Sequence, residues 1–319
     1  MKTYLVTGGA GFIGSHIVAA LVEKKSFEDS EIRVLDDFST GFEQNISPYL
    51  AANEIQLFDG SILDANVCER ATAGVDVVFH EAALASVPLS LKEPCRVHEV
   101  CATGTLQLLD AARRSGVRRV VYAASSSAYG ETETSTKSES ELPQPISPYG
   151  ASKLAGEYYM RVFASSFDIE TVCLRYFNVF GPRQDPLSPY SAVIPLFIRT
   201  MLSGQSPVIF GDGTQSRDFT HVSNIVGANL LASEAPREKV SGRVFNVASG
   251  VSSTLLALVE ALNNILGTQI APIHEAPRPG DILHSAADIS AARDALGYTP
   301  KTTFVEGLRD TVRYYRNTL

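Results

Sequence analysis

The stretch Tyr4-Leu-Val-Thr7 is a short apolar run that leads directly into Gly8-Gly9-Ala10-Gly11-Phe12-Ile13-Gly14, and this segment decides the fold. A helix is expected from about Phe12. The glycines at positions 8, 11 and 14 allow a tight turn and close packing of that helix against the strand. The segment therefore predicts the first strand–turn–helix unit of an α/β sheet.

Four more apolar runs follow the same pattern. Each is short, rich in β-branched residues and almost continuously apolar, as expected of parallel strands buried on both faces. They are Ile32–Asp36, Val75–Phe79, Arg119–Ala123 and Thr171–Arg175. Helical patterns such as Cys101–Ser115 lie between them. Repeated βα units predict an α/β fold, a doubly wound parallel sheet of the Rossmann type with helices on both faces.

The rhythm of strands and helices breaks after about residue 176, where proline and glycine become frequent. We expect residues 1–176 to form the sheet domain and residues 177–319 to form mainly a smaller α/β lobe. Val222–Glu234 and Arg243–Val247 again have the patterns of a helix and a strand. The chain is therefore expected to rejoin the sheet at about 218–248, without a clean boundary.

The glycine turn is also suited to binding a phosphate. A helix N-terminus offers unpaired N–H groups and a positive dipole end to a dinucleotide pyrophosphate. The second strand ends at Asp36-Asp37, where a carboxylate can accept both ribose hydroxyls and would repel a 2′-phosphate. These features favour NAD over NADP. The alternatives are a plain tight turn and an aspartate that caps the end of a strand.

Two hydroxyl-bearing segments are candidates for catalysis. Ser147-Pro148-Tyr149 opens a helix in which Tyr149 and Lys153 stand at i and i+4 on one face. Such a pair alone also arises by chance. The strand over 119–124 ends in three serines, at the edge where open α/β sheets place their ligands. A plain turn is the alternative for these serines, which are Ser125, Ser126 and Ser127.

The bulk composition excludes several functions. The 319 residues are 45% hydrophobic and 19% charged, with a net charge of −8, so no broad basic face is available for nucleic acid or a membrane surface. Neither a signal peptide nor an apolar run of about 20 residues is found. The four cysteines lack metal-ligand spacing, as do the six histidines, and we expect no metal. A cytoplasmic protein is predicted.

Seven segments in this order resemble the extended short-chain dehydrogenases/reductases, and within them the UDP-hexose 4-epimerases of the UDP-N-acetylglucosamine 4-epimerase type. The resemblance covers nearly the whole chain. The segments are GGAGFIG (8–14), DDFSTG (36–41), HEAALASVP (80–88), SSSAYG (125–130), YGASK (149–153), YFNVFGPRQDP (176–186) and RPGD (278–281).

The resemblance implies the roles of the site residues. Tyr149 is expected to take the proton of the sugar 4-hydroxyl, with its pKa lowered by the Lys153 ammonium and the nicotinamide. Ser125 is expected at the 4-oxygen, with Ser126 or Ser127 as alternatives. The NAD-binding residues implied are Gly8, Gly11, Phe12, Ile13, Gly14, Asp36, Asp37, Phe38, Ser39, Thr40, Gly41, Gly60, Ser61, Ile62, Ala82, Ala83, Tyr149, Lys153 and Phe177.

The second lobe is implied to bind the UDP-sugar. Two arginines from separate loops suit a diphosphate, although a surface ion pair is the alternative for each. A serine at 285 removes bulk where a 2-acetamido group would sit, which favours UDP-GlcNAc and UDP-GalNAc; plain surface filler is the alternative. The substrate residues implied are Ser86, Ser126, Ser127, Asn178, Ala192, Val193, Arg217, Arg278, Asp281 and Ser285.

The chain departs from the resemblance at two positions. Ser61 replaces an aspartate expected near the adenine, and Cys101 replaces an asparagine. The expected activity is C4 epimerisation through a 4-keto sugar. A 4,6-dehydratase is disfavoured because Ser126 and Ser127 stand where an acid–base pair is needed. A UDP-glucuronate 4-epimerase or decarboxylase and a non-catalytic NAD-binding regulator remain open, and the family suggests a homodimer through helices 101–115 and 149–163.

Overall fold

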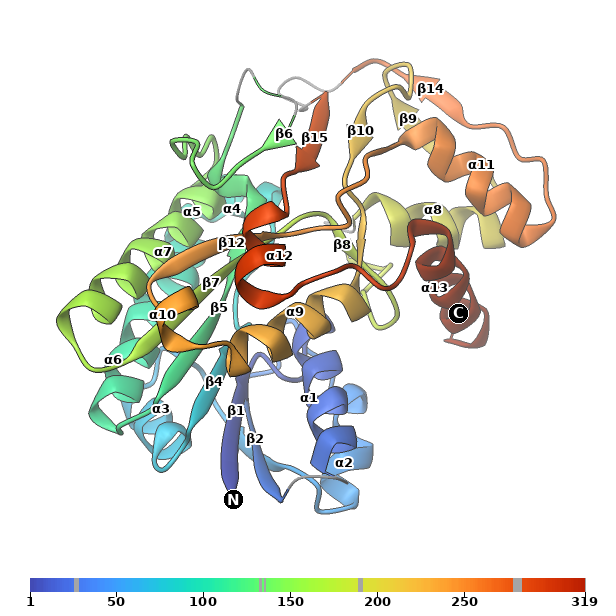
Figure 1. Ribbon diagram of the computed structural model, residues 1–319. Coiled ribbons are helices and arrows are strands. Elements are labelled where there is room, and N and C mark those ends of the chain that lie inside the picture. The colour runs from blue at the N-terminus through green and yellow to red at the C-terminus, as the bar shows by residue number, and fades with distance from the viewer. Residues whose placement is uncertain (26–28, 132–133, 135, 189–191, 278–282, 319) are drawn as a thin grey trace.

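The computed structural model describes residues 1–25, 29–131, 134, 136–188, 192–277 and 283–318. Its centre is a seven-stranded parallel sheet in the order β12-β7-β5-β4-β1-β2-β3 (Figure 1). The predicted Rossmann-type fold is confirmed. The strands are β1 (Lys2–Thr7), β2 (Ser30–Asp36), β3 (Gln56–Asp59), β4 (Val77–His80), β5 (Arg119–Ser125), β7 (Glu170–Tyr176) and β12 (Arg243–Val247).

The central strands of this sheet follow the apolar runs of the sequence. Every residue of β5 and β7 is buried, as expected of strands with helices on both faces. The edge strand β3 was not predicted because it is short, with both ends exposed and its two central residues half-buried. Its pattern therefore lacks the continuous apolar run that identifies the others.

Helices cover both faces of the sheet. On one face α3 (Ala65–Thr72), α6 (Thr105–Arg114) and α7 (Pro148–Ser166) pack against each other and against β5 (Figure 1). The opposite face carries α1 (Phe12–Lys25), α9 (Val222–Glu234) and α12 (Ser290–Leu296). The shorter helices are α2 (Ser47–Ala51), α4 (Val87–Lys92), α5 (Pro94–His98) and α10 (Arg237–Val240).

The predicted continuous helix over Cys101–Ser115 is wrong in its first turn. Glu99–Gly104 form a π-helical turn, and the α-helix begins only at Thr105. Such turns insert a residue into a helix and are frequent at functional sites. Here the turn lies between α5 and α6 and contacts α7.

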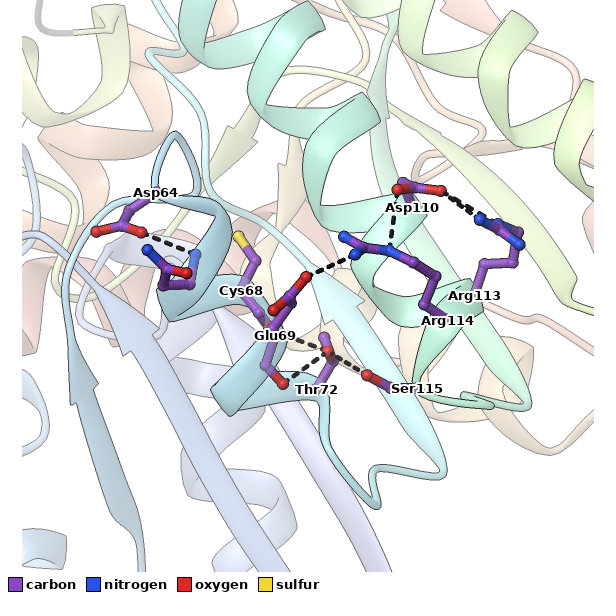
Figure 2. A network of polar contacts seen from close by, with 9 residues as sticks. Asp64, Cys68, Glu69, Thr72, Asp110, Arg113, Arg114 and Ser115 are labelled. Atoms are coloured by element: carbon purple, nitrogen blue, oxygen red, sulfur yellow. Dashed lines mark hydrogen bonds and ion pairs between the residues drawn. The ribbon is translucent and has the colours of Figure 1, made fainter.

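A polar network joins the C-terminal end of α6 to α3 on the surface (Figure 2). Arg114 pairs with Glu69 at 2.6 Å and with Asp110 at 3.1 Å. The Thr72 hydroxyl lies 3.0 Å from that of Ser115. The ion pairs are close to half exposed, so water screens them and each contributes about 0–1 kcal/mol.

The smaller lobe lies beside the sheet, and its helices α8 (Val193–Leu202), α11 (Leu255–Leu266) and α13 (Phe304–Thr318) share a separate apolar core (Figure 1). After entering this lobe the chain returns to the sheet through α9 and β12. The division at residue 176 stays a prediction. Short strands complete the lobe and its junction with the sheet: β6 (Thr136–Lys137), β8 (Val179–Phe180), β9 (Val208–Phe210), β10 (Ser216–Arg217), β11 (Thr220–His221), β13 (Ser253–Thr254), β14 (Ile273–Glu275) and β15 (His284–Ala287).

Within the described ranges, each helix is either too short or too polar to cross a lipid bilayer.

Candidate active site

The glycine turn has the geometry that its spacing predicts. Gly8 has a φ of +66°, and a Cβ there would lie 2.8 Å from the backbone of Ala82. A Cβ on Gly14 would lie 2.1 Å from the carbonyl oxygen of Gly8, so α1 begins in direct contact with the turn. Only glycine permits both approaches. The turn thus brings backbone N–H groups and the start of α1 to the carboxyl edge of β1.

The end of β2 braces this turn. The carboxylate of Asp36 accepts hydrogen bonds from the N–H groups of Ala10 and Phe38, each at 2.8 Å, and burial raises its pKa. The side chain of the neighbouring Asp37 is exposed. Its partial burial raises its pKa, but Ser39, whose N–H donates to it, and Ser61 outweigh this effect, so that the pKa of Asp37 is lowered. Ser61 thus lies near enough to favour the carboxylate of Asp37. An aspartate at position 61 would bring a second negative charge there.

The predicted catalytic residues converge at the carboxyl edge of β5. Tyr149 and Lys153 are 9% and 2% exposed, on the first turns of α7, which Ser147 caps by accepting from the Gly150 N–H at 3.1 Å. The Ser125 side chain lies near the Tyr149 hydroxyl and acts to lower the pKa of that phenol. Its Oγ also accepts from the Ser127 N–H at 3.2 Å. Of the three serines, only Ser125 is among the groups that affect the pKa of Tyr149.

The protein groups alone do not lower the pKa of Tyr149. Burial raises that pKa above its ordinary value, and Cys101 adds to the effect, whereas Ser125 opposes it. The Lys153 ammonium donates to the Ala123 carbonyl at 2.9 Å. A lowering of the Tyr149 pKa by Lys153 together with the nicotinamide stays a prediction. Burial lowers the pKa of Lys153 itself.

Lys153 rests on an aromatic ring. Its Nζ lies 4.9 Å from the centre of the Tyr122 ring, a cation–π contact, and the Tyr122 hydroxyl donates to the Lys153 carbonyl at 3.3 Å. This approach depends on Gly156, because a Cβ there would lie 2.3 Å from the Tyr122 oxygen. Sequence reasoning missed Tyr122. Its position inside an apolar strand gave no indication of a contact with the site.

The other predicted cofactor residues follow neighbouring strands at the same edge of the sheet. Their positions agree with the rule that ligands of open α/β sheets lie outside the carboxyl ends of the strands. They are Phe38, Ser39, Thr40 and Gly41 after β2, Gly60, Ser61 and Ile62 after β3, Ala82 and Ala83 after β4, and the fully buried Phe177 after β7.

The predicted substrate residues are more dispersed. Arg217 on β10 pairs with Ser285 on β15, so the two are neighbours in the lobe. Asn178 is exposed just after β7 with a φ of +33°, and its carbonyl accepts from the Thr220 N–H at 3.2 Å.

The remaining predicted substrate residues lie in several other elements. Ser86 caps α4, since its hydroxyl accepts from the Leu89 N–H at 3.1 Å. Ala192 and Val193 begin α8, and Ser126 and Ser127 are half-buried after β5, whereas Arg278 and Asp281 lie outside the described residues.

Two acidic residues at the same edge were not predicted. Glu81 follows β4 and accepts from the Tyr176 hydroxyl at 2.8 Å, and that hydroxyl accepts from Asn229 at 2.7 Å. Burial raises the pKa of Glu81 to about 7, opposed by Tyr176 and Lys153. Asp218 is fully buried and accepts from the Ser249 and Gly250 N–H groups at 2.8 and 2.9 Å. Acidic residues at strand ends were the available sequence indication.

The site residues fit a dinucleotide. Glycine leaves the turn open where any side chain would fill it, and the first turn of α1 carries no acidic residue that would repel a phosphate. Asp36 ends β2 at the position suited to a ribose. The Tyr149–Lys153 pair stands along the same edge, next to Ser125.

Comparison with known proteins gives consistent results. The NAD dependent epimerase/dehydratase family matches residues 4–248. A putative UDP-glucose 4-epimerase of Methanocaldococcus jannaschii is 35% identical over 315 residues, 98% of this chain and 98% of the relative.

Two solved structures have the same fold over the whole chain. A UDP-N-acetylglucosamine 4-epimerase from Methanobrevibacter ruminantium, in complex with UDP-N-acetylmuramic acid, is 41% identical with a TM-score of 0.93, covering 100% of this chain and 99% of that one. A UDP-glucuronic acid 4-epimerase from Bacillus cereus, in complex with UDP-glucuronic acid and NAD, is 31% identical with a TM-score of 0.90, covering 100% of both chains.

These relatives confirm three predictions: an extended short-chain dehydrogenase/reductase resembling UDP-hexose 4-epimerases, an isomerase of the UDP-sugar 4-epimerase class, and NAD as the cofactor. The chain belongs to the NAD-dependent epimerase/dehydratase family.

Proposed function

We propose that this protein epimerises C4 of a UDP-hexose, with UDP-GlcNAc and UDP-GalNAc as preferred substrates and UDP-Glc and UDP-Gal as further ones. The observation that carries the proposal is the buried Tyr149, near Ser125 and one helical turn before Lys153, at the sheet edge that also holds the glycine turn. A phenol and an ammonium in this arrangement suit proton transfer at a sugar hydroxyl.

The proposed reaction divides the work among three side chains. Bound NAD supplies the acceptor and the donor for the C4 hydride. Tyr149 takes the proton of the 4-hydroxyl and later returns it to the 4-oxygen. In between, the 4-keto sugar turns over in the pocket, so that C4 recovers the hydride on its opposite face. Ser125 holds the 4-oxygen. Lys153, fixed by Ala123 and Tyr122, supplies positive charge and holds the nicotinamide ribose.

The preference for an N-acetylated sugar rests on Ser285. This small, half-buried residue lies beside Arg217, the side chain we assign to the pyrophosphate. Arg278 is assigned to the same pyrophosphate and Asp281 to the ribose on the family resemblance alone. Space at 285 would admit a 2-acetamido group, whereas a large side chain there would exclude it.

The substrate assignment is tested by comparing UDP-Glc, UDP-GlcNAc and UDP-GlcA in parallel, with products identified by NMR and the bound cofactor identified after release. In Ser285→Tyr we expect kcat/KM for UDP-GlcNAc to fall at least about tenfold more than that for UDP-Glc. Equal losses on both substrates would refute the assignment of Ser285.

A UDP-glucuronate 4-epimerase or decarboxylase is the second candidate, supported by the likeness to the Bacillus cereus enzyme. Faster conversion of UDP-GlcA than of UDP-GlcNAc would favour it. A protein that holds NAD but converts none of the three sugars would instead be a non-catalytic regulator.

We also propose a cytoplasmic homodimer. The four cysteines are free thiols, as expected in a reducing compartment. Tyr158 and Val162 stand one turn apart on α7 and are 53% and 51% exposed, an apolar face that a second copy would cover. Analytical ultracentrifugation of Tyr158→Glu and Val162→Glu tests this, and unchanged mass relative to the parent protein would contradict an interface on α7.

A further inference from the structure

Three side chains behind the active site form one buried polar chain. Thr7 ends β1, His80 ends β4 and Thr105 begins α6, and all three are 0% exposed. The Thr7 hydroxyl lies 2.8 Å from Nδ1 of His80, and the Thr105 hydroxyl lies 2.9 Å from Nε2. Both ring nitrogens of His80 are therefore hydrogen-bonded.

The direction of every hydrogen bond in this chain follows from counting protons. The Thr105 hydroxyl donates its single proton to the Cys101 carbonyl at 2.8 Å, so it can only accept from Nε2 of His80. Burial, with Lys153 as a smaller cause, lowers the pKa of His80 to about 3, so the ring is neutral. Nδ1 then accepts from Thr7, whose oxygen accepts in turn from the Ala82 N–H at 3.3 Å.

The two ends of the chain reach different parts of the site. The Ala82 end is in contact with Gly8, the first residue of the glycine turn. The Cys101 end lies in the π-helical turn, and Cys101 shares a buried cluster with Tyr149. A single row of hydrogen bonds therefore links the cofactor turn to the backbone against which Tyr149 packs.

The middle of the chain supports Lys153. The His80 ring lies 5.5 Å from the Tyr122 ring, tilted by 32°, and Tyr122 carries the Lys153 ammonium on its ring. His80 is thus connected to Lys153 through Tyr122, and to Tyr149 through Thr105 and Cys101.

We propose that His80, as the neutral tautomer protonated at Nε2, is a positioning residue that sets the distance between the bound dinucleotide and the Tyr149–Lys153 pair. The role rests on the proposed epimerisation, in which the 4-hydroxyl proton passes to Tyr149 and the C4 hydride passes to the dinucleotide. The dinucleotide and the Tyr149–Lys153 pair must then be held at a fixed distance from each other, because a displacement of about 1 Å costs about 10²-fold in rate.

Substitutions of His80 distinguish the contribution of its hydrogen bonds from that of its ring volume. In His80→Phe, which keeps the ring volume without its hydrogen bonds, kcat for the preferred sugar is expected to fall about 10²-fold with NAD still bound and KM nearly unchanged. In His80→Gln, whose amide retains one donor and one acceptor, most of this loss is expected to be recovered. Equal kcat values in His80→Phe and the parent protein would overturn the proposal.

A second variant, Thr105→Val, alters the Thr105 end of the hydrogen-bond chain. The protein also offers a matched control for it at Thr72. Thr72 is also 0% exposed, and its hydroxyl donates to the Cys68 carbonyl at 2.8 Å, as Thr105 donates to Cys101 (Figure 2). Thr105→Val and Thr72→Val remove the same group from the same helical geometry. We expect both to lower the melting temperature, but only Thr105→Val to lower kcat. Equal effects on kcat would show a purely structural role.

The tautomer is tested without substrate, by ¹⁵N NMR of the histidine-labelled holoenzyme. His80 is expected to carry its proton on Nε2 and not to titrate between pH about 5 and about 8. A proton on Nδ1, or titration in this range, would overturn the hydrogen-bond chain. Since this result needs no turnover, a protein inactive on every UDP-sugar but with the expected tautomer would refute the proposed function and not the hydrogen-bond chain.

Discussion

Helix α6 has a polar network at each end. The network at one end is buried, and the network at the other end is exposed to water. At its N-terminal end Thr105 belongs to the chain through His80 and Thr7, all fully buried. At its C-terminal end Arg114 bridges Glu69 and Asp110, in side chains that are 47%, 48% and 42% exposed (Figure 2). One network lies under the candidate active site, and the other lies at the surface contact with α3.

The two networks differ in whether water can take the place of a lost partner. A surface charge that loses its partner is solvated again, so the pair contributes little. A buried donor that loses its acceptor finds no other partner, which costs about 1–3 kcal/mol. Equal chemical changes should therefore have small effects at the surface and large ones beneath the site.

The largest effect is expected from Tyr149→Phe, which removes one oxygen from the buried region. The variant should keep its fold and bound NAD but lose about 10²–10⁴-fold in kcat, the usual contribution of a general acid–base group. Product formation by NMR and the NAD content after denaturation measure the two quantities. Near-normal turnover would eliminate Tyr149 as the proton carrier.

Glu81 should make the buried region sensitive to pH. Burial raises its pKa from 4.5 to about 7, so between these values the folded protein binds more protons than the unfolded chain. Its contribution to the free energy of unfolding is therefore fully present below about pH 4.5 and is lost as the pH rises through about 7. The loss is on the order of 3 kcal/mol.

Glu81→Gln isolates this contribution, because other buried carboxyls such as Asp36 and Asp218 also have raised pKa values and act in the same direction. Urea unfolding at pH about 5 and about 8, at fixed NAD concentration, should show a smaller loss of stability in the variant. Parallel pH profiles for the two proteins would show that Glu81 is charged throughout.

Two helical glycines should respond to alanine with opposite signs. At Gly156 in α7 a Cβ would lie 2.3 Å from the Tyr122 oxygen, so Gly156→Ala should cost about 1–3 kcal/mol and reduce activity through Lys153. At Gly227 in α9 a Cβ meets nothing within 4 Å, so Gly227→Ala should stabilise by about 0.5–1 kcal/mol. Chemical denaturation measures both, and the same sign in both would contradict the close contact at Tyr122.

The smallest effect is expected at the surface network. Glu69→Gln removes one charge next to Arg114, which keeps its contact with Asp110. The free energy of unfolding should change by less than about 0.5 kcal/mol, and kcat should not change. A loss of several kcal/mol in chemical denaturation would show that the two ends of α6 are not energetically distinct.

The same helix shows how far the sequence predicts the structure. The strands and the glycine turn were predictable because each is a local pattern, a run of buried residues or a spacing of glycines. The π-helical turn over Glu99–Gly104 was not, because one inserted residue leaves the apolar pattern of Cys101–Ser115 almost unchanged. Helical periodicity does not distinguish the two.

The candidate site divides in the same way. Tyr149, Lys153 and Ser125 lie in short motifs, and the structure brings them together. The chain from Thr7 through His80 to Thr105 joins positions 73 and 25 residues apart, and only the order of strands in the sheet makes them neighbours. The behaviour of Tyr149 also depends on burial, which a motif does not report.

The central claim, a transient oxidation at C4 of a UDP-sugar, is tested most directly by following an isotope at that carbon. UDP-GlcNAc carrying deuterium at C4 is incubated with the holoenzyme in ordinary water, and UDP-GalNAc is isolated and examined by NMR. If C4 is oxidised and reduced again by the same bound dinucleotide, the deuterium remains at C4 of the product. Epimerised product that has lost the deuterium to solvent, or the absence of any UDP-GalNAc, would contradict the claim.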